Sequence, residues 1–189
     1  MLTVERLSIP DVLLVRAERY EDARGYLSEV YSRARFAAIG IDLEFVQDNQ
    51  SFSAERGVVR GLHYQLPPHA QGKLVRAVAG RILDVAVDLR LGSPTYGEYC
   101  AAELSAENGV QMWVPPGFAH GFATLTPACE VLYKVTSAYA PGSERALAWN
   151  DPALGIDWPV DPHAVILSEK DRTAPHLGAL GPVFPPGSY

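Results

Sequence analysis

Two alternating runs on either side of a glycine decide the fold: Leu74-Val75-Arg76-Ala77-Val78-Ala79, then Gly80-Arg81, then Ile82-Leu83-Asp84-Val85-Ala86-Val87-Asp88-Leu89. Side chains alternate between the two faces of a strand, so Leu83, Val85, Val87 and Leu89 share one face of the second run. Asp84 and Asp88 take the opposite face. The pattern predicts a β-hairpin with one core face and one polar face.

Other short apolar runs extend this pattern along the chain, at 110–114, 121–125 and 130–135, each bounded by Pro, Gly or Asn. Short strands punctuated in this way are typical of an antiparallel sandwich or barrel, so the sequence predicts an all-β fold. Helical signal is confined to a short segment at 33–39 before Gly40 and to 151–155, which is expected to form either a turn or a single helical coil. The proline-rich stretch from Pro175 predicts an irregular tail.

Length and composition predict one domain over residues 1–189, because the chain is 48% hydrophobic and long enough for one sizeable core. The net charge of -6, without a block of Lys or Arg, argues against nucleic-acid binding. No signal peptide is recognisable and no apolar run approaches the ~20 residues that span a bilayer, so we expect a cytoplasmic protein without a membrane partner. Cys100 and Cys129 form no CxxC pair and are expected to be buried free thiols.

Three elements carry candidate chemistry. Val59-Arg60-Gly61-Leu62-His63-Tyr64-Gln65 places a histidine near an arginine, with Lys73 soon after. Pro115-Pro116-Gly117-Phe118-Ala119-His120 supplies a second histidine, and Tyr133 lies on the strand face of Val131 and Val135. Proton abstraction next to a ketone needs a base, positive charge at the oxygen and an acid on the opposite face. His63, with an ordinary pKa of about 6.5, suits the base; Lys73 and Arg60 suit the cations, and Tyr133 suits the acid.

Each residue also has a structural interpretation. A lone strand histidine is commonly a hydrogen-bonded core residue, and Tyr133 alone would be a core tyrosine. His120 could cap a turn, and Arg24 with Glu29, or Lys170 with Asp171, could form surface ion pairs. A metal site is not expected, because two histidines are too few ligands and Lys73 would repel a cation.

A larger set of motifs resembles the dTDP-4-dehydrorhamnose 3,5-epimerase family over nearly the whole chain. The matching segments are Asp22-Ala23-Arg24-Gly25-Tyr26 with Glu29, Phe45-Val46-Gln47-Asp48-Asn49-Gln50-Ser51, Arg60–Gln65, Lys73, Pro116–Phe122, Glu144-Arg145, Trp149–Pro152 and Ser168-Glu169-Lys170-Asp171. The resemblance implies a cupin-type jelly-roll core at roughly 20–140 with the C-terminal segment packed on it. It also implies a homodimer that uses no metal and no cofactor.

The family further implies roles for individual residues. Asp171 would orient His63, and the enzyme would invert C3 and C5 of dTDP-4-dehydro-6-deoxy-D-glucose to give dTDP-4-dehydro-L-rhamnose. The residues implied to bind this substrate, some of them across the dimer interface, are Arg24, Glu29, Gln47, Asp48, Asn49, Arg60, His120, Tyr139, Glu144 and Lys170.

Two alternatives stay open at this point. One is a relative on the same scaffold that epimerises C3 or C5 only, or isomerises the keto group. The other is a non-catalytic sugar-binding cupin. The joint presence of His63, Lys73 and Tyr133 disfavours the second alternative, since a binding module needs no acid and base on opposing strands.

Overall fold

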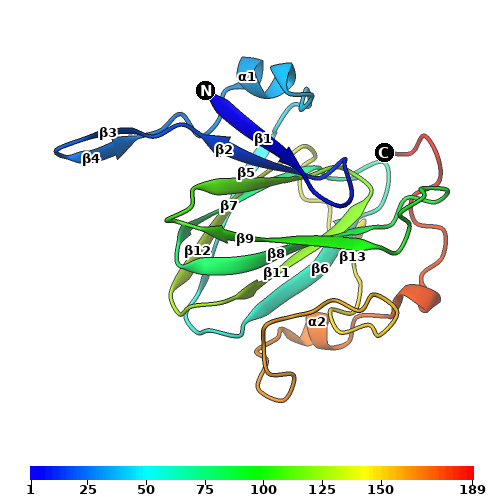
Figure 1. Ribbon diagram of the computed structural model, residues 1–189. Helices are drawn as coiled ribbons and strands as arrows, with labels where there is room; N and C mark the ends of the chain where they lie inside the picture. The colour runs from blue at the N-terminus through cyan, green and yellow to red at the C-terminus, as the bar shows by residue number, and fades with distance from the viewer.

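The computed structural model describes residues 1–189 as a sandwich of two antiparallel sheets (Figure 1). The six-stranded sheet has the order β1 (Leu2–Arg6), β2 (Leu13–Ala17), β10 (Val110–Val114), β7 (Lys73–Ala79), β12 (Cys129–Val135) and β5 (Gln47–Ser53). The five-stranded sheet has the order β13 (Glu144–Ala146), β6 (Val59–Gln65), β11 (Phe118–Thr124), β8 (Arg81–Asp88) and β9 (Tyr99–Ser105). The predicted all-β class with few short helices is confirmed.

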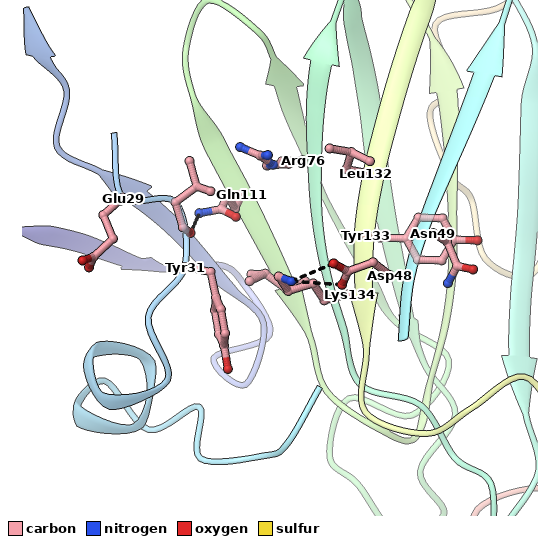
Figure 2. Close-up of a pocket in the computed structure, with 11 residues that line it drawn as sticks. Glu29, Tyr31, Asp48, Asn49, Arg76, Gln111, Leu132, Tyr133 and Lys134 are labelled. Atoms are coloured by element: carbon pink, nitrogen blue, oxygen red, sulfur yellow. Dashed lines mark hydrogen bonds and ion pairs between the residues drawn. The ribbon is translucent and has the colours of Figure 1, made fainter. Parts of the chain in front are cut away.

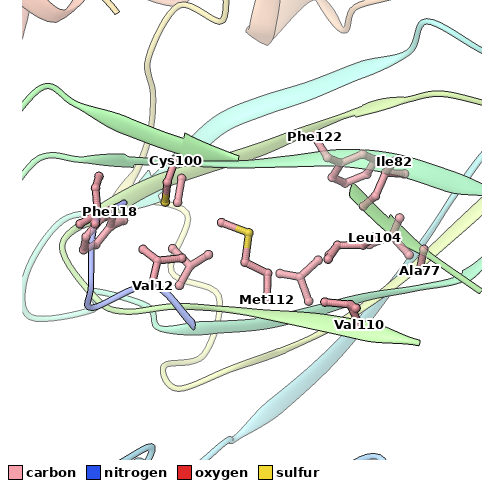
Figure 3. Packing of buried hydrophobic residues seen from close by; sticks show 14 of the residues in the cluster. Val12, Ala77, Ile82, Cys100, Leu104, Val110, Met112, Phe118 and Phe122 are labelled. Carbon is pink, nitrogen blue, oxygen red and sulfur yellow. The ribbon is translucent and has the colours of Figure 1, made fainter. Parts of the chain in front are cut away.

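The space between the sheets holds the main core (Figure 3). Val75 and Met112 come from the six-stranded sheet, and Ile82, Ala86 and Phe122 from the five-stranded one; all are at most 4% exposed. Burying apolar area of this kind contributes about 25 cal/mol for each Å² removed from water, which makes the interior the main source of stability.

The predicted hairpin at Gly80 is wrong. β7 hydrogen-bonds to β10 and β12, whereas β8 hydrogen-bonds to β11 and β9, so the chain crosses from one sheet to the other between them. Gly80 makes this crossing at a φ of +69°, and a Cβ there would lie 2.6 Å from Cys129 Sγ. Alternation along two runs cannot tell a hairpin from a corner between sheets, because both have the same pattern.

β8 is buried on both faces. Ile82, Asp84 and Asp88 are 0% exposed and their face looks into the sandwich. The other face, with Val85 and Val87, packs against a second cluster whose further members include Trp149, Leu154, Trp158 and Phe184 from the C-terminal part of the chain. The predicted alternation is therefore present, but the polar face is an interior one.

Three segments do not belong to the two sheets of the sandwich: a small hairpin, a short helix and the chain after β13. The hairpin of β3 (Tyr20–Asp22) and β4 (Gly25–Leu27) projects away from the sandwich with all six residues exposed (Figure 1). α1 (Arg33–Ala38) is the short helix expected before Gly40. After β13 the chain has only α2 (Glu169–Arg172) and the 3-10 helix Leu177–Ala179, and no helix is long and apolar enough to cross a membrane.

Candidate active site

Arg60 and His63 border the same cavity, at one side of the sandwich, because β6 contains a bulge between them. Residues three apart fall on opposite faces of a regular strand, but β6 has an extra residue here: His63 lies opposite His120, and Arg60 opposite Phe122. Gly61 makes the bulge possible with a φ of +125°, and a Cβ at Gly61 would lie 2.6 Å from the Cα of Gly121. Only glycine satisfies both constraints.

His63 and Asp171 form a hydrogen-bonded pair. His63 Nε2 lies 2.5 Å from Asp171 Oδ1, and the Asp171 side chain is 3% exposed. A backbone bridge between Val58 and Ile166 leads the chain to α2, where the Ser168 hydroxyl accepts from the Asp171 N–H. Burial would raise the pKa of Asp171, but hydrogen bonds from His63 and Ser168 outweigh it and hold that pKa below its ordinary value. Asp171 is therefore an acceptor, which assigns the proton to Nε2 of His63 and leaves Nδ1 free.

The electrostatics of His63 suit a general base. Burial lowers the pKa of His63 below its ordinary value, although the neighbouring Asp171 carboxylate opposes that shift. The imidazole is accordingly neutral near pH 7 and can accept a proton. This is the state that proton abstraction from carbon requires.

Lys73 and Tyr133 complete the centre of the cavity. Lys73 is 7% exposed and donates from Nζ to the carbonyl oxygen of His63 at 3.2 Å. Burial lowers the pKa of Lys73 to about 8, against the charge of Asp84. Burial also raises the pKa of Tyr133, with Arg60 opposing, so the phenol keeps its proton. A cation and a neutral acid thus stand beside a neutral base.

The cavity has two lobes that share His63, Lys73 and Tyr133. The first has a volume of about 360 Å³. It is lined by Ser51, Val58, Val59, Arg60, His120, Phe122, Ile166, Leu167, Ser168, Lys170 and Asp171 in addition to the shared three. Arg60 is held there by donating to the Ser53 hydroxyl at 3.1 Å and to the Phe52 carbonyl at 2.9 Å.

The second lobe, of about 220 Å³, is bordered by amides and acids: Gln47, Asn49, Tyr64, Gln65, Gln71, Tyr139 and Glu144. Glu144 accepts from the Tyr139 hydroxyl at 3.0 Å and pairs with Lys170 Nζ at 2.6 Å. Burial would raise the pKa of Glu144, but Lys170 and Tyr139 hold it below its ordinary value. The two lobes together bring eight further predicted site residues around the shared three.

Three predicted binding residues lie elsewhere. Alternation along β5 turns Asp48 away from Gln47 and Asn49, and it pairs with Lys134 at 3.0 Å on the outside of the six-stranded sheet (Figure 2). A separate cavity lies on this outer side of the sheet, and both Asp48 and Glu29 border it. Glu29 pairs there with Arg35 at 3.2 Å. Arg24 pairs with Asp22 at the tip of the projecting hairpin, so the suggested Arg24–Glu29 ion pair does not form.

Two features of the site escaped prediction. Gln65 is 3% exposed and holds the loop that carries Tyr139 in place through hydrogen bonds. Its side-chain N–H groups donate to the carbonyl oxygens of His69 and Ala138, and its side-chain oxygen accepts from the Ala140 N–H. Asp84 lies behind His120 at 2.8 Å. The alternation predicted Asp84 on a polar strand face together with Asp88, so no local signal marked it as part of the site. Nowhere do three or more His, Cys, Asp or Glu side chains gather in a way that could hold a metal ion.

Comparison with known proteins agrees with this geometry. The family model of dTDP-4-dehydrorhamnose 3,5-epimerase matches residues 6–179. The chain belongs to this family. The dTDP-4-dehydrorhamnose 3,5-epimerase of Sinorhizobium fredii is 53% identical over 176 residues, which cover 93% of this chain and 90% of that protein. The enzyme of the same name from Pseudomonas aeruginosa is 56% identical over 168 residues, covering 88% and 91%.

A solved structure resembles the whole chain. The dTDP-6-deoxy-D-glucose-3,5-epimerase of Legionella pneumophila Philadelphia 1, crystallised in complex with dTDP-4-keto-L-rhamnose, matches with a TM-score of 0.93 at 42% identity and covers 98% of both chains. The resemblance seen in the sequence, the cupin-type fold and the enzyme class, a sugar-nucleotide 3,5-epimerase, are thereby confirmed.

Proposed function

We propose that this epimerase inverts C3 and C5 of dTDP-4-dehydro-6-deoxy-D-glucose, with His63 as the base and Tyr133 as the acid. The observation that carries the proposal is the shared cavity, in which a neutral imidazole oriented by Asp171 and a protonated phenol border the same space. A proton leaves the carbon next to the C4 ketone for Nδ1 of His63, and the C–H electron pair becomes the enolate.

The enolate oxygen then carries the negative charge, which the Lys73 ammonium stabilises, with Arg60 adding positive charge to the same cavity. Tyr133 returns a proton to the carbon from the other face of the ring, and the ketone re-forms. Configuration inverts because the proton leaves on one face and arrives on the other. Once His63 has released its proton to solvent and Tyr133 has taken one up, the same cycle at the second carbon gives dTDP-4-dehydro-L-rhamnose.

We further propose that a homodimer completes the binding site. Arg24 is placed at the tip of a hairpin that leaves its own sandwich, and Tyr26 and Leu27 on that hairpin are 57% and 75% exposed. A second copy that covers these apolar residues would receive Arg24 near its own cavity, where a guanidinium suits the diphosphate.

Subunit complementation tests this arrangement. Arg24→Ala and His63→Ala chains are each expected to have little activity alone. A mixture of the two should regain activity, because one site of each mixed dimer then combines an intact His63 with an intact Arg24 from the partner. A mixture no more active than its components would contradict a shared site.

Exchange with solvent deuterium tests the reaction. In heavy water the wild-type protein should place deuterium at both C3 and C5 of the substrate, read by NMR. Label at one carbon only would indicate a mono-epimerase, label without inversion a keto isomerase, and no label a sugar-binding protein. His63→Ala should abolish exchange at both carbons.

A further inference from the structure

Asp84 is a buried carboxylate whose hydrogen bonding is incomplete. It lies in β8 with 0% exposure, and its Oδ1 accepts from His120 Nε2 at 2.8 Å. Its Oδ2 is buried without any hydrogen-bond partner. A buried oxygen without a hydrogen-bond partner in the protein is destabilising, so Asp84 is a candidate for a role other than packing.

The same strand provides a comparison in Asp88, which faces the same side and is equally buried. Asp88 accepts from Arg90, Ser93 and Thr95 at 2.6–2.9 Å, so its charge is fully compensated by neighbours on a surface loop. Asp84 has His120 alone. The protein therefore supplies hydrogen-bond donors for both oxygens of Asp88, but for only one oxygen of Asp84.

Asp84 and Lys73 face the same space between the two sheets. Lys73 shares a strand face with Val75 in β7, Asp84 shares one with Ile82 and Ala86 in β8, and these three apolar residues pack together in the core. Nζ of Lys73 has no carboxylate within ion-pair distance and donates only to the backbone of His63. Among the charges that keep the pKa of Lys73 from falling further through burial, Asp84 has the largest effect and Glu144 a smaller one, while Lys170 opposes both.

We propose that Asp84 is a positioning residue that keeps Lys73 in its ammonium form while leaving the hydrogens of that ammonium free for the substrate. The inference rests on the proposed function, in which Lys73 stabilises the enolate oxygen. A carboxylate in direct contact would occupy the donors of Lys73, whereas one held back by His120 supplies its charge without occupying them. The free oxygen of Asp84 is then the cost of that arrangement.

The pH dependence that follows depends on all groups facing the cavity. Those that line the cavity with Lys73 are Arg60, His63, Tyr64, His120, Tyr133, Tyr139, Glu144, Lys170 and Asp171, and Asp84 lies behind His120. The pKa of Tyr133 is raised above 10 and that of His63 lowered below 6.5. Lys73, with a pKa of about 8, is thus the group whose deprotonation ends activity on the alkaline side. Activity should be lost as the pH rises through about 8, since the ammonium is the working form.

Asp84→Asn removes the charge but keeps the shape and an acceptor for His120. We expect the alkaline midpoint of kcat/KM to move to lower pH by on the order of one unit, and kcat/KM at pH 8 to fall by about fivefold, because the protonated fraction of Lys73 falls from about one half to about one tenth. Asp84→Ser should move the midpoint in the same direction and serves if the asparagine variant does not fold. Asp88→Asn is the matched control: its Tm should fall while the midpoint stays.

The variants also distinguish a charge role from a packing role. Combined with Lys73→Met, Asp84→Asn should cause no further loss of solvent exchange, because its effect passes through the ammonium. A pH profile of folded Asp84→Asn or Asp84→Ser that superimposes on that of the wild type would overturn the inference while leaving the epimerase proposal intact. A wild-type profile with no alkaline limb between pH 7 and 9 would also overturn it. Wild-type protein without any solvent exchange would remove both proposals.

Discussion

Asp171→Asn probes the pair that prepares the base. The substitution keeps the size of the side chain but replaces a carboxylate that accepts from His63 Nε2 at 2.5 Å and is 3% exposed. A hydrogen bond to a charged group contributes about 1.5–3 kcal/mol, and each 1.36 kcal/mol corresponds to a tenfold change in rate. The lost bond alone therefore predicts a fall in kcat of about 10- to 150-fold. An asparagine amide that donates to Nε2 would also move the ring proton to Nδ1 and so block the base, which makes tenfold the lower bound.

The assay is the rate of deuterium incorporation into the substrate, followed by NMR at saturating concentration, with the Tm measured in parallel. Glu169→Gln is the matched control, because Glu169 lies two residues away on the same short helix with a side chain that is 83% exposed. We expect the control to retain the wild-type rate. A folded Asp171→Asn protein that exchanges within about twofold of the wild type would refute the orientation argument.

Three further predictions concern the acid, the base and the bulge. Tyr133→Phe should still exchange the proton that His63 removes but form little inverted product, and normal product formation would exclude the phenol as the acid. Since burial lowers the pKa of His63 and the neutral ring is the working form, kcat/KM should fall only when the pH drops through a midpoint below 6.5; a higher midpoint would contradict this assignment. Gly61→Ala should reduce the free energy of unfolding by about 3 kcal/mol or more, as measured by denaturant titration. Gly25→Ala is the control, because Gly25 has nearly the same φ but a Cβ there would have no atom within 4 Å. It should reduce the free energy of unfolding by about 1 kcal/mol. Equal losses for the two variants would show that the close approach of the Gly61 and Gly121 backbones is unimportant.

The sequence predicts the individual strands better than it predicts which strands pair and which side chains form the site. Alternation predicts strands such as β10 well, because a strand with one face toward the core between the sheets needs apolar side chains on that face, at a period of two. It fails at Gly80, where the partners of β7 and β8 are distant in sequence. It also fails for Asp84, because a polar residue on one face of an isolated strand resembles a solvent-facing one.

In the site, too, some residues could be predicted from the sequence and others could not. His63, Lys73 and Tyr133 could be predicted as a group from the chemistry that each residue type supports, and the cavity joins them. The link from Arg60 to His63 depends on a bulge that requires the backbones of Gly61 and Gly121 to touch, which no local pattern reports. Arg24 lies at the tip of an exposed hairpin, outside the cavity of its own chain, so its role in binding stays a prediction.

The account stands on His63 and Tyr133 acting on opposite faces of one sugar ring. The most direct test is a crystal structure of the protein with its dTDP-sugar bound, from which the distances of C3 and C5 to His63 Nδ1 and to Tyr133 Oη are measured. We predict a pyranose lying between the two groups, each within about 3–3.5 Å of a reacting carbon, and the C4 oxygen at Lys73 Nζ. A ring that has both groups on the same face, or that lies outside the cavity they share, would contradict the mechanism.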